Sequence, residues 1–295
     1  MIIGMNFFRA ILETNFMQYA LVTGILIGFL APLMGAFVVI RRLSLIADTL
    51  SHFSLAGLAI GLYFINSLGL VFFKDPLYLG MLFAVIGSLI IEVLRGYYRN
   101  YKEISMPIVI SLGTALSALF ISLGGGFNSS IYNYLFGSIL TVGRTFTIII
   151  IIVSIIIFAL IIFFYKQMVI ISFDETYARL LGIRVNLFQF FTTIILALVV
   201  SLSIETVGVL LVSSLMIIPV AAAMKVGKSF KNTLFIAIVF SEISVLLGLW
   251  FSFVFRIPSG ATIVLFNIMI LIIIVIFKRL ISSKNLKEKQ LESEI

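Results

Sequence analysis

The sequence predicts an all-α polytopic membrane protein, and three observations support this fold class. Hydrophobic residues make up 62% of the 295-residue chain, charged residues make up only 11%, and the mean hydropathy is +1.27. Residues 147–164 and 263–277 carry no charged side chain over nearly the length of a membrane helix. The basic residues are dispersed between apolar segments, which indicates topology signals and argues against a nucleic-acid partner.

About nine membrane spans are expected, or eight if residues 187–224 form one broken unit. Residues 1–15 are expected to lie at the membrane interface, and residues 125–144 are too polar and glycine-rich to span, which predicts an outer loop or re-entrant element. Seven of the expected spans are apolar segments at 16–40, 43–65, 77–95, 104–124, 145–165, 233–254 and 260–277. The other two are short helices within 187–224 that are expected to meet at Glu205–Thr206. The membrane domain is thus expected at 16–278, followed by a charged cytoplasmic tail at 279–295.

The distribution of basic residues predicts the orientation in the plasma membrane. With nine spans and the N-terminus outside, only four of the 20 Lys and Arg residues lie outside, namely Arg9, Lys74, Arg144 and Arg256. The positive-inside rule therefore favours nine spans and a cytoplasmic C-terminus.

An acid and the only histidine of the chain lie within the apolar stretch 41–61. Asp48 and His52 are four residues apart, so a helix places them on one face, at about 9 Å and about 15 Å from the Arg41–Arg42 pair. Intramembrane ionisable residues are costly to bury and indicate a functional site. A homodimer would supply two Asp and two His to a metal ion; the alternative is a structural pair in which Asp48 accepts a hydrogen bond from His52 or Arg41.

Three further polar residues are candidates for a metal pathway. Glu205 and Glu242 lie within apolar segments, and Ser51 adjoins His52. Their alternative interpretations are structural: Glu205 solvated at the mouth of two short spans, and Glu242 hydrogen-bonded between helices. The chain contains no cysteine, so any metal ligands must be oxygen atoms or imidazole nitrogens.

The sequence at about 173–183 predicts a short, capped cytoplasmic helix. Asp174 can cap its N-terminus, Glu175 adds negative charge there, and Gly182 can end it. Tyr177, Leu180 and Leu181 then share one side, which suits either a docking surface for a soluble partner or a helix lying on lipid.

Nucleotide binding by this chain is not expected. The tripeptide at 227–229 imitates the end of a phosphate-binding loop, but Ala222 stands where the first glycine is needed and no strand precedes it. Elsewhere, Glu92 and Arg95 are three residues apart and are expected to pair on one helix.

Several of these segments resemble the membrane permeases of the ABC importers for zinc, manganese and iron chelates, in particular the zinc-uptake members. The resemblance rests on FVVIRRLSLIADTLSHFSLAGLAIG at 37–61, FGSIL at 136–140, DETYARLLGI at 174–183, VGVLLVSSLMIIPVAAA at 207–223 and PSGATIVL at 258–265. It implies a bacterial homodimer with two cytoplasmic ATPase subunits and an extracytoplasmic metal-binding protein. Asp48 and His52 match the family's D-x-x-x-H and would line the metal path.

The resemblance also implies that the helix at 174–182 couples the permease to the ATPase, through Asp174, Glu175, Tyr177, Ala178, Leu181 and Gly182. The expected function is ATP-driven import of a divalent metal ion by alternating access, with zinc as the cargo, manganese or iron as alternatives, ATP on the partner subunit and no permanently bound cofactor. The chain itself is not expected to be an enzyme.

Two other functions remain open from the residues alone. In a secondary transporter without an ATPase, Asp48, Glu205 and Glu242 would form an ion relay. In an intramembrane enzyme, His52 would act as a base, although no serine has an evident activating partner beyond Ser51.

Overall fold

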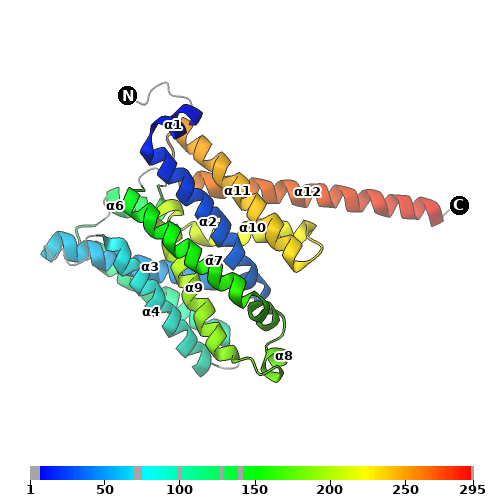
Figure 1. Cartoon of the computed structure of the whole chain (residues 1–295), viewed down its shortest axis with the longest axis horizontal. Coiled ribbons are helices and arrows are strands. Elements are labelled where there is room, and N and C mark those ends of the chain that lie inside the picture. The colour runs from blue at the N-terminus through cyan, green and yellow to red at the C-terminus, as the bar shows by residue number, and fades with distance from the viewer. Residues whose placement is uncertain (1–6, 69–74, 99–100, 127–128, 139–141, 294–295) are drawn as a thin grey trace.

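The protein is a helical bundle throughout the residues that the structure describes. The computed structural model describes residues 7–68, 75–98, 101–126, 129–138 and 142–293. Every regular element within these ranges is a helix (Figure 1). The all-α membrane fold class predicted from composition is confirmed.

Eight of the described helices are long and apolar enough to cross a membrane, and α10 is a shorter apolar helix. The elements are α1 (Phe7–Glu13), α2 (Asn15–Ile40), α3 (Leu45–Leu68), α4 (Pro76–Tyr97), η1 (Lys102–Ile104), α5 (Ser105–Leu123), α6 (Ser129–Phe136), α7 (Arg144–Phe173), α8 (Glu175–Leu180), α9 (Val185–Val207), α10 (Val212–Val226), α11 (Phe230–Phe255) and α12 (Ser259–Ser293). α12 runs through residue 278 and projects well beyond the bundle (Figure 1).

Two predicted boundaries differ from the structure. α7 continues to Phe173 rather than ending at 165, because Lys166 and Gln167 are followed by more apolar residues that extend the helix. α9 is a full-length span, and the break falls at 208–211 rather than at Glu205–Thr206. Glu205 thus lies within the last turns of α9. The backbone after α9 pairs with α6, where Val209 N–H donates to the Tyr134 carbonyl (2.9 Å).

The two ends of the bundle are identified by α6 and α8, which lie at opposite ends of α7 (Figure 1). We call them the α6 face and the α8 face. α10 begins beside α6, after the turn that pairs with Tyr134. Its end leads into Phe230, whose ring packs on Phe37 and Phe173 at the α8 face.

α10 therefore carries the chain from one face to the other, although its 15 residues cover only about 22 Å along the helix axis. A bilayer core is about 30 Å thick, so this passage is shorter than a normal span. Among the described residues, eight long helices and the short α10 thus run between the two faces, which is why the sequence is compatible with either eight or nine spans.

α3 lies inside the bundle and positions the candidate site. It packs against α4, α5, α9 and α10, and most of its side chains are buried. Its hydroxyl groups are satisfied locally or across close contacts, since Ser54 Oγ donates to the Gly80 carbonyl of α4 (2.9 Å). Ser54 also lies 3.4 Å from Ser201 of α9, so α3 is held on two sides by polar contacts.

Candidate functional site

The turn between α2 and α3 sets the depth of Asp48 and His52. Arg41 to Ser44 are not helical, and Arg42 adopts a positive φ of 56°. α3 begins only at Leu45, which places Asp48 in its first turn and His52 about one turn further along. Both residues therefore lie closer to the α8 face than the distances counted from Arg41 predict, because four residues form a turn instead of a helix.

Asp48 and His52 lie side by side, as their spacing predicts. His52 Nε2 is 3.9 Å from Asp48 Oδ1, and the two side chains are 35% and 20% exposed for Asp48 and His52, respectively. The other imidazole nitrogen, Nδ1, is buried and has no hydrogen-bond partner among the described residues. The pair is thus close but not joined by a hydrogen bond of normal length, so both groups keep free electron pairs for a cation.

The exposed part of the site is a narrow stripe on an otherwise buried helix. Leu45, Asp48 and His52 recur at helical spacing and are exposed or partly exposed, whereas their neighbours from Ile46 to Leu50 and beyond are mostly buried. Leu45 is half exposed, so the stripe is accessible along one side of α3.

α5 approaches the backbone of α3 at the level of His52. A side chain on Gly113 would place its Cβ 3.0 Å from the His52 carbonyl carbon. Only a residue without a side chain permits this distance without moving a helix. Gly113 therefore helps to fix the position of the imidazole relative to α5.

By themselves, the described residues of one chain do not assemble a full set of metal ligands. Among the described residues, no group of three or more His, Cys, Asp and Glu side chains is close enough to hold one ion. A tetrahedral or octahedral ion needs four to six donors, which Asp48 and His52 cannot provide alone. Any ion at this pair would need further donors from water, backbone or a second chain.

Glu205 lies on the α6 face and is separate from the Asp48–His52 pair. It is in the last turns of α9, about one turn beyond Ser201, and its Oε2 atom is buried without a hydrogen-bond partner among the described residues. Burial raises the pKa of the nearby Tyr134 phenol above its ordinary value, and the charges of Asp75 and Glu205 raise it further. The three groups thus form a cluster that includes Asp75, the residue that caps α4.

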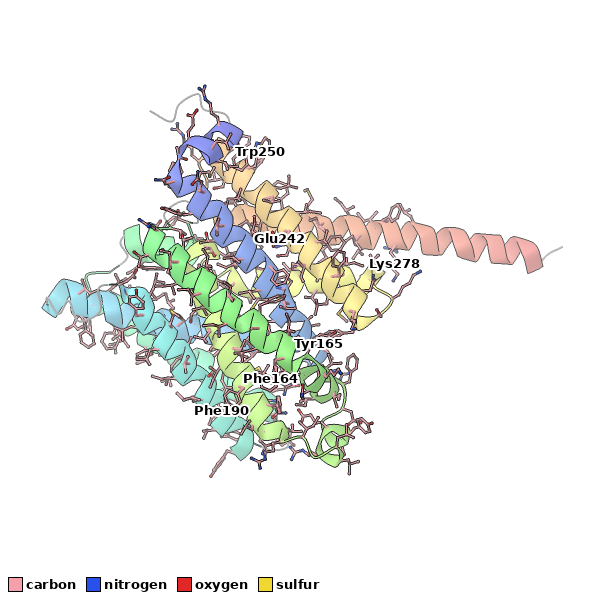
Figure 2. All side chains as sticks on the ribbon, viewed as in Figure 1. Phe164, Tyr165, Phe190, Glu242, Trp250 and Lys278 are labelled. Carbon is pink, nitrogen blue, oxygen red and sulfur yellow. The ribbon has the colours of Figure 1, made fainter. Side chains whose placement is uncertain are left out.

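The side chains of Glu242 and Ser51 also lie apart from the exposed atoms of Asp48 and His52. The Glu242 carboxylate of α11 faces Gly28 of α2, where it lies 3.2 Å from the position that a Cβ would take (Figure 2). The Ser51 hydroxyl is buried and donates to the Asp48 carbonyl (2.9 Å).

The capped helix predicted near 173–183 is present as α8. Asp174 Oδ1 accepts hydrogen bonds from Thr176 N–H (2.8 Å) and Tyr177 N–H (2.9 Å). At the other end of α8, Gly182 has a φ of 77°. Two backbone hydrogen bonds end the helix there: Gly182 N–H donates to the Arg179 carbonyl (3.0 Å) and Ile183 N–H donates to the Ala178 carbonyl (3.1 Å). These are the paired bonds of a Schellman motif, so both predicted caps are confirmed.

α8 is tied to the start of the α2–α3 turn. Arg41 Nη2 lies 3.5 Å from Glu175 Oε1, and Gln189 Nε2 of α9 donates to the same oxygen (2.5 Å). Burial lowers the pKa of the Arg41 guanidinium, the positive charge of Arg95 lowers it further, and Glu175 counteracts both. Glu175 therefore connects the first turn of α8 to the residues that precede Asp48.

The outer side of α8 is apolar and exposed. Tyr177, Leu180 and Leu181 are all more than half exposed, and Leu180 reaches 81%. Ala178 is instead fully buried and packs with Ile171 and Val185, so it attaches α8 to the bundle and cannot itself face a partner.

Sequence reasoning missed the contacts that join distant segments. The Arg41–Glu175 ion pair, the Gly113–His52 approach and the Asp75–Glu205–Tyr134 cluster link residues far apart in the chain. Only Asp75 carried a local signal, because an aspartate directly before Pro76 is a favourable start for a helix.

Comparison with known proteins decides the family. The model of a family described as "ABC 3 transport family" matches residues 13–278, which is most of the chain. The chain belongs to the ABC 3 transport family. It is therefore a multi-pass membrane subunit of an ABC transporter and not an enzyme, as expected.

Relatives match over nearly their full lengths. A probable metal transport system membrane protein of Treponema pallidum is 31% identical, over 90% of this chain and 96% of its own length. The manganese transport system membrane protein MntC of Listeria monocytogenes is 30% identical over 92% and 94%. The manganese import system permease protein ScaB of Streptococcus gordonii is 31% identical over 91% and 93%. Where these names specify a metal it is manganese, so the comparison does not favour the expected zinc-uptake members.

Solved structures share the fold. PsaBC from Streptococcus pneumoniae in complex with Fab aligns with a TM-score of 0.77 and 30% identity, covering 91% of this chain and 94% of that chain. An inward-facing putative metal-chelate type ABC transporter aligns with a TM-score of 0.67 over 90% and 87%, at 18% identity, and supports the fold alone.

Proposed function

We propose that this ABC 3 family permease imports a divalent metal ion, with manganese as the favoured cargo, and that the ion passes through a site formed by Asp48 and His52. The observation that carries the proposal is the position of this pair. One carboxylate and one imidazole lie 3.9 Å apart on a partly exposed stripe of a helix that is otherwise buried. Burying such groups is costly, and a passing cation is the chemistry that would compensate.

Manganese is favoured over zinc because of the relatives and because the donor set permits it. The named relatives of Listeria and Streptococcus are manganese transport proteins. Carboxylate oxygen suits Mn²⁺, imidazole nitrogen suits Zn²⁺ and Fe²⁺, and the chain has no thiolate to favour softer ions. Zinc and iron therefore remain alternative cargoes of the same site.

A second copy of the chain would complete the site. Two ligands per chain are too few, and a twofold axis along the exposed stripe would bring together two Asp48 and two His52 side chains. A weak, shared site of this kind would hold the ion for a short time and still release it, which transport requires.

ATP hydrolysis would act on the site through α8. The exposed apolar side of α8 offers a docking surface for a cytoplasmic ATPase, and Asp174 and Gly182 keep the helix folded. Glu175 would pass a displacement of α8 to Arg41 and then to the first turn of α3. An extracytoplasmic metal-binding protein would deliver the ion at the α6 face of a bacterial plasma membrane.

Uptake of radioactive Mn²⁺ and Zn²⁺ into vesicles that contain the full complex tests this function. Asp48→Asn and His52→Ala should each lower Mn²⁺ uptake at least about tenfold, because each removes a ligand from both halves of the site. Glu103→Gln is the control, since Glu103 is an exposed acid in η1 and should leave uptake unchanged. Normal uptake by both site variants, at normal expression, would refute the assignment.

The same vesicles separate an ABC importer from a secondary transporter. The proposal expects uptake to stop when ATP or the ATPase subunit is withheld. Full uptake driven by an ion gradient alone would support the relay of Asp48, Glu205 and Glu242 instead.

A further inference from the structure

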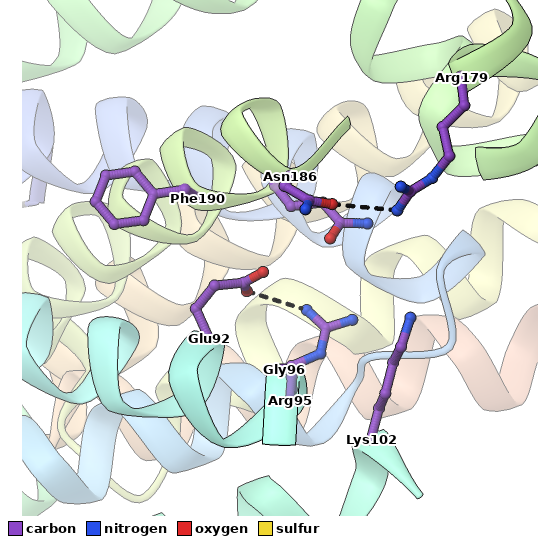
Figure 3. A pocket seen from close by; sticks show the side chains of 8 residues that line it. Glu92, Arg95, Gly96, Lys102, Arg179, Asn186 and Phe190 are labelled. Atoms are coloured by element: carbon purple, nitrogen blue, oxygen red, sulfur yellow. Dashed lines mark hydrogen bonds and ion pairs between the residues drawn. The ribbon is translucent and has the colours of Figure 1, made fainter. Parts of the chain in front are cut away.

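A cavity of about 600 Å³ opens beside α8 and has no role in the proposed metal path. It lies between α4, η1, α8 and α9, and Figure 3 shows Arg95, Lys102 and Arg179 directed into it from three different elements. Glu92 and Phe190 form part of the remaining wall.

The walls of the cavity are basic. Arg95, Lys102 and Arg179 carry three positive charges against the single carboxylate of Glu92. Glu92 Oε2 pairs with Arg95 Nη1 at 3.4 Å, and Arg179 Nη2 donates to Asn186 Oδ1 (3.1 Å), so most donors of both guanidinium groups stay available. These charges repel a divalent cation, which argues against the cavity as the exit route for the metal.

Arg95 provides the second observation that points to an anion. Its side chain is only 7% exposed, and its Nε atom is buried without a hydrogen-bond partner among the described residues. Burying a charged donor is costly unless a partner accepts its hydrogen bonds. An anion in the cavity would supply that partner.

The surroundings of the cavity place it at the level of lipid headgroups. Exposed tyrosines adjoin two of the lining residues in the sequence: Tyr97 and Tyr98 follow Gly96 at the end of α4, and Tyr101 precedes Lys102 of η1. Phe190 and Phe191 are exposed on the α9 side. Aromatic residues of this kind gather where a membrane helix meets the water interface.

We infer that this cavity binds the phosphate of an anionic phospholipid headgroup. Basic pockets between membrane helices are suited to such headgroups, and Phe190 would contact the apolar part of the same lipid. A bound headgroup would bridge Arg95 of α4 and Arg179 of α8, and thereby connect α8 to the bilayer as well as to the bundle.

Native mass spectrometry of the purified permease with its ATPase partner, in mild detergent, tests the inference. The complex is titrated with phosphatidylglycerol, and phosphatidylcholine serves as the neutral lipid. Lys102→Gln should weaken the first bound phosphatidylglycerol about fivefold, because it removes one basic group from the headgroup site. Lys228→Gln removes the same charge from an exposed position that does not line the cavity, and should bind phosphatidylglycerol like the unmodified chain.

Four results would overturn the inference. Equal losses in Lys102→Gln and Lys228→Gln, or equal affinity for the two lipids, would show general surface attraction. Inorganic phosphate that binds without lipid and with the same dependence on Lys102 would show a free-phosphate site. Lipid binding to the permease alone but not to the complex would show that the ATPase occupies the cavity. Since the readout is lipid binding, none of these outcomes depends on the identity of the transported metal.

Discussion

Single residues connect α8 to the candidate metal ligands. Glu175 accepts a hydrogen bond from Gln189 and forms an ion pair with Arg41. Arg41 lies at the end of α2, directly before the turn that leads into α3. The guanidinium is largely buried whereas the carboxylate is about one-third exposed. Solvent therefore partly screens this ion pair. Among the described residues it is the ion pair that links α8 to this turn.

Glu175→Gln should lower Mn²⁺ uptake about fivefold while ATP hydrolysis by the complex continues. The amide keeps the shape of the side chain but removes its charge, which weakens the contact with Arg41. Uptake and ATP hydrolysis measured in the same vesicles give the ratio of ions moved per ATP.

Glu13→Gln is the matched control for this change. Glu13 pairs with Arg9 at 2.7 Å on the exposed surface of α1, far from α8, and should leave the ratio unchanged. An unchanged ratio in Glu175→Gln would show that the ATPase acts through another contact.

Local spacing predicted the parts of the site that belong to one helix. The contact of Asp48 with His52 follows from the helical repeat, and the caps Asp174 and Gly182 follow from residue type at helix ends. The Arg41–Glu175 pair joins residues 41 and 175, so no local pattern could reveal it. The start of α3 at Leu45 was also unpredictable. Arg42 takes its positive φ where Arg42 N–H and Leu43 N–H close the end of α2, and an arginine gives no signal for this conformation.

At the scale of elements, close contacts between helix backbones hold the bundle together. A Cβ on Gly35 of α2 would lie 2.0 Å from the Met216 carbonyl oxygen of α10. This is far inside any normal contact, so α2 and α10 touch through their backbones at this point. α10 lies between α2, α11 and α12, and its position depends on this contact.

Gly35→Ala should destabilise the protein by about 3 kcal/mol, because α2 and α10 must separate to admit the methyl group. Thermal unfolding in detergent measures the effect. Gly96→Ala is the control: Gly96 lies in α4 with no atom within 4 Å of its would-be Cβ, and should be neutral or slightly stabilising. Equal melting temperatures for the two variants would contradict the close contact.

The apolar runs predicted most elements but not their ends. Hydropathy located the eight long spans, since length and composition decide them. It failed at the end of α7 and at the break after α9, where Lys166 and Glu205 are polar yet remain helical. The long, exposed side chain of Lys166 can reach the interface, so its charge does not end α7. Glu205 instead remains helical with a buried carboxylate oxygen.

At the scale of the whole molecule, the short helix α10 decides on which sides the termini lie. α1 lies at the α6 face, because Phe7 packs on Phe253 near the end of α11 (5.9 Å between ring centroids). Lys278 Nζ of α12 contacts the Lys225 carbonyl at the end of α10, at the α8 face. The two ends of the bundle thus hold opposite ends of the chain, which agrees with nine passages.

Single cysteines test this arrangement cleanly, because the chain has none of its own. In intact cells, an impermeant maleimide should label Arg9→Cys and Tyr132→Cys, which lie exposed at the α6 face. Arg179→Cys and Lys278→Cys should react only after the membrane is permeabilised. Labelling of Arg9→Cys and Lys278→Cys from the same side would show that α10 does not cross.

The central claim is that two copies of α3 share one metal ion between Asp48 and His52. Titration of the purified full complex with Mn²⁺, followed by electron paramagnetic resonance, measures how many ions it holds. The account predicts one bound Mn²⁺ per two permease chains, and loss of this ion in Asp48→Asn. One ion per chain, or unchanged binding by Asp48→Asn, would contradict it.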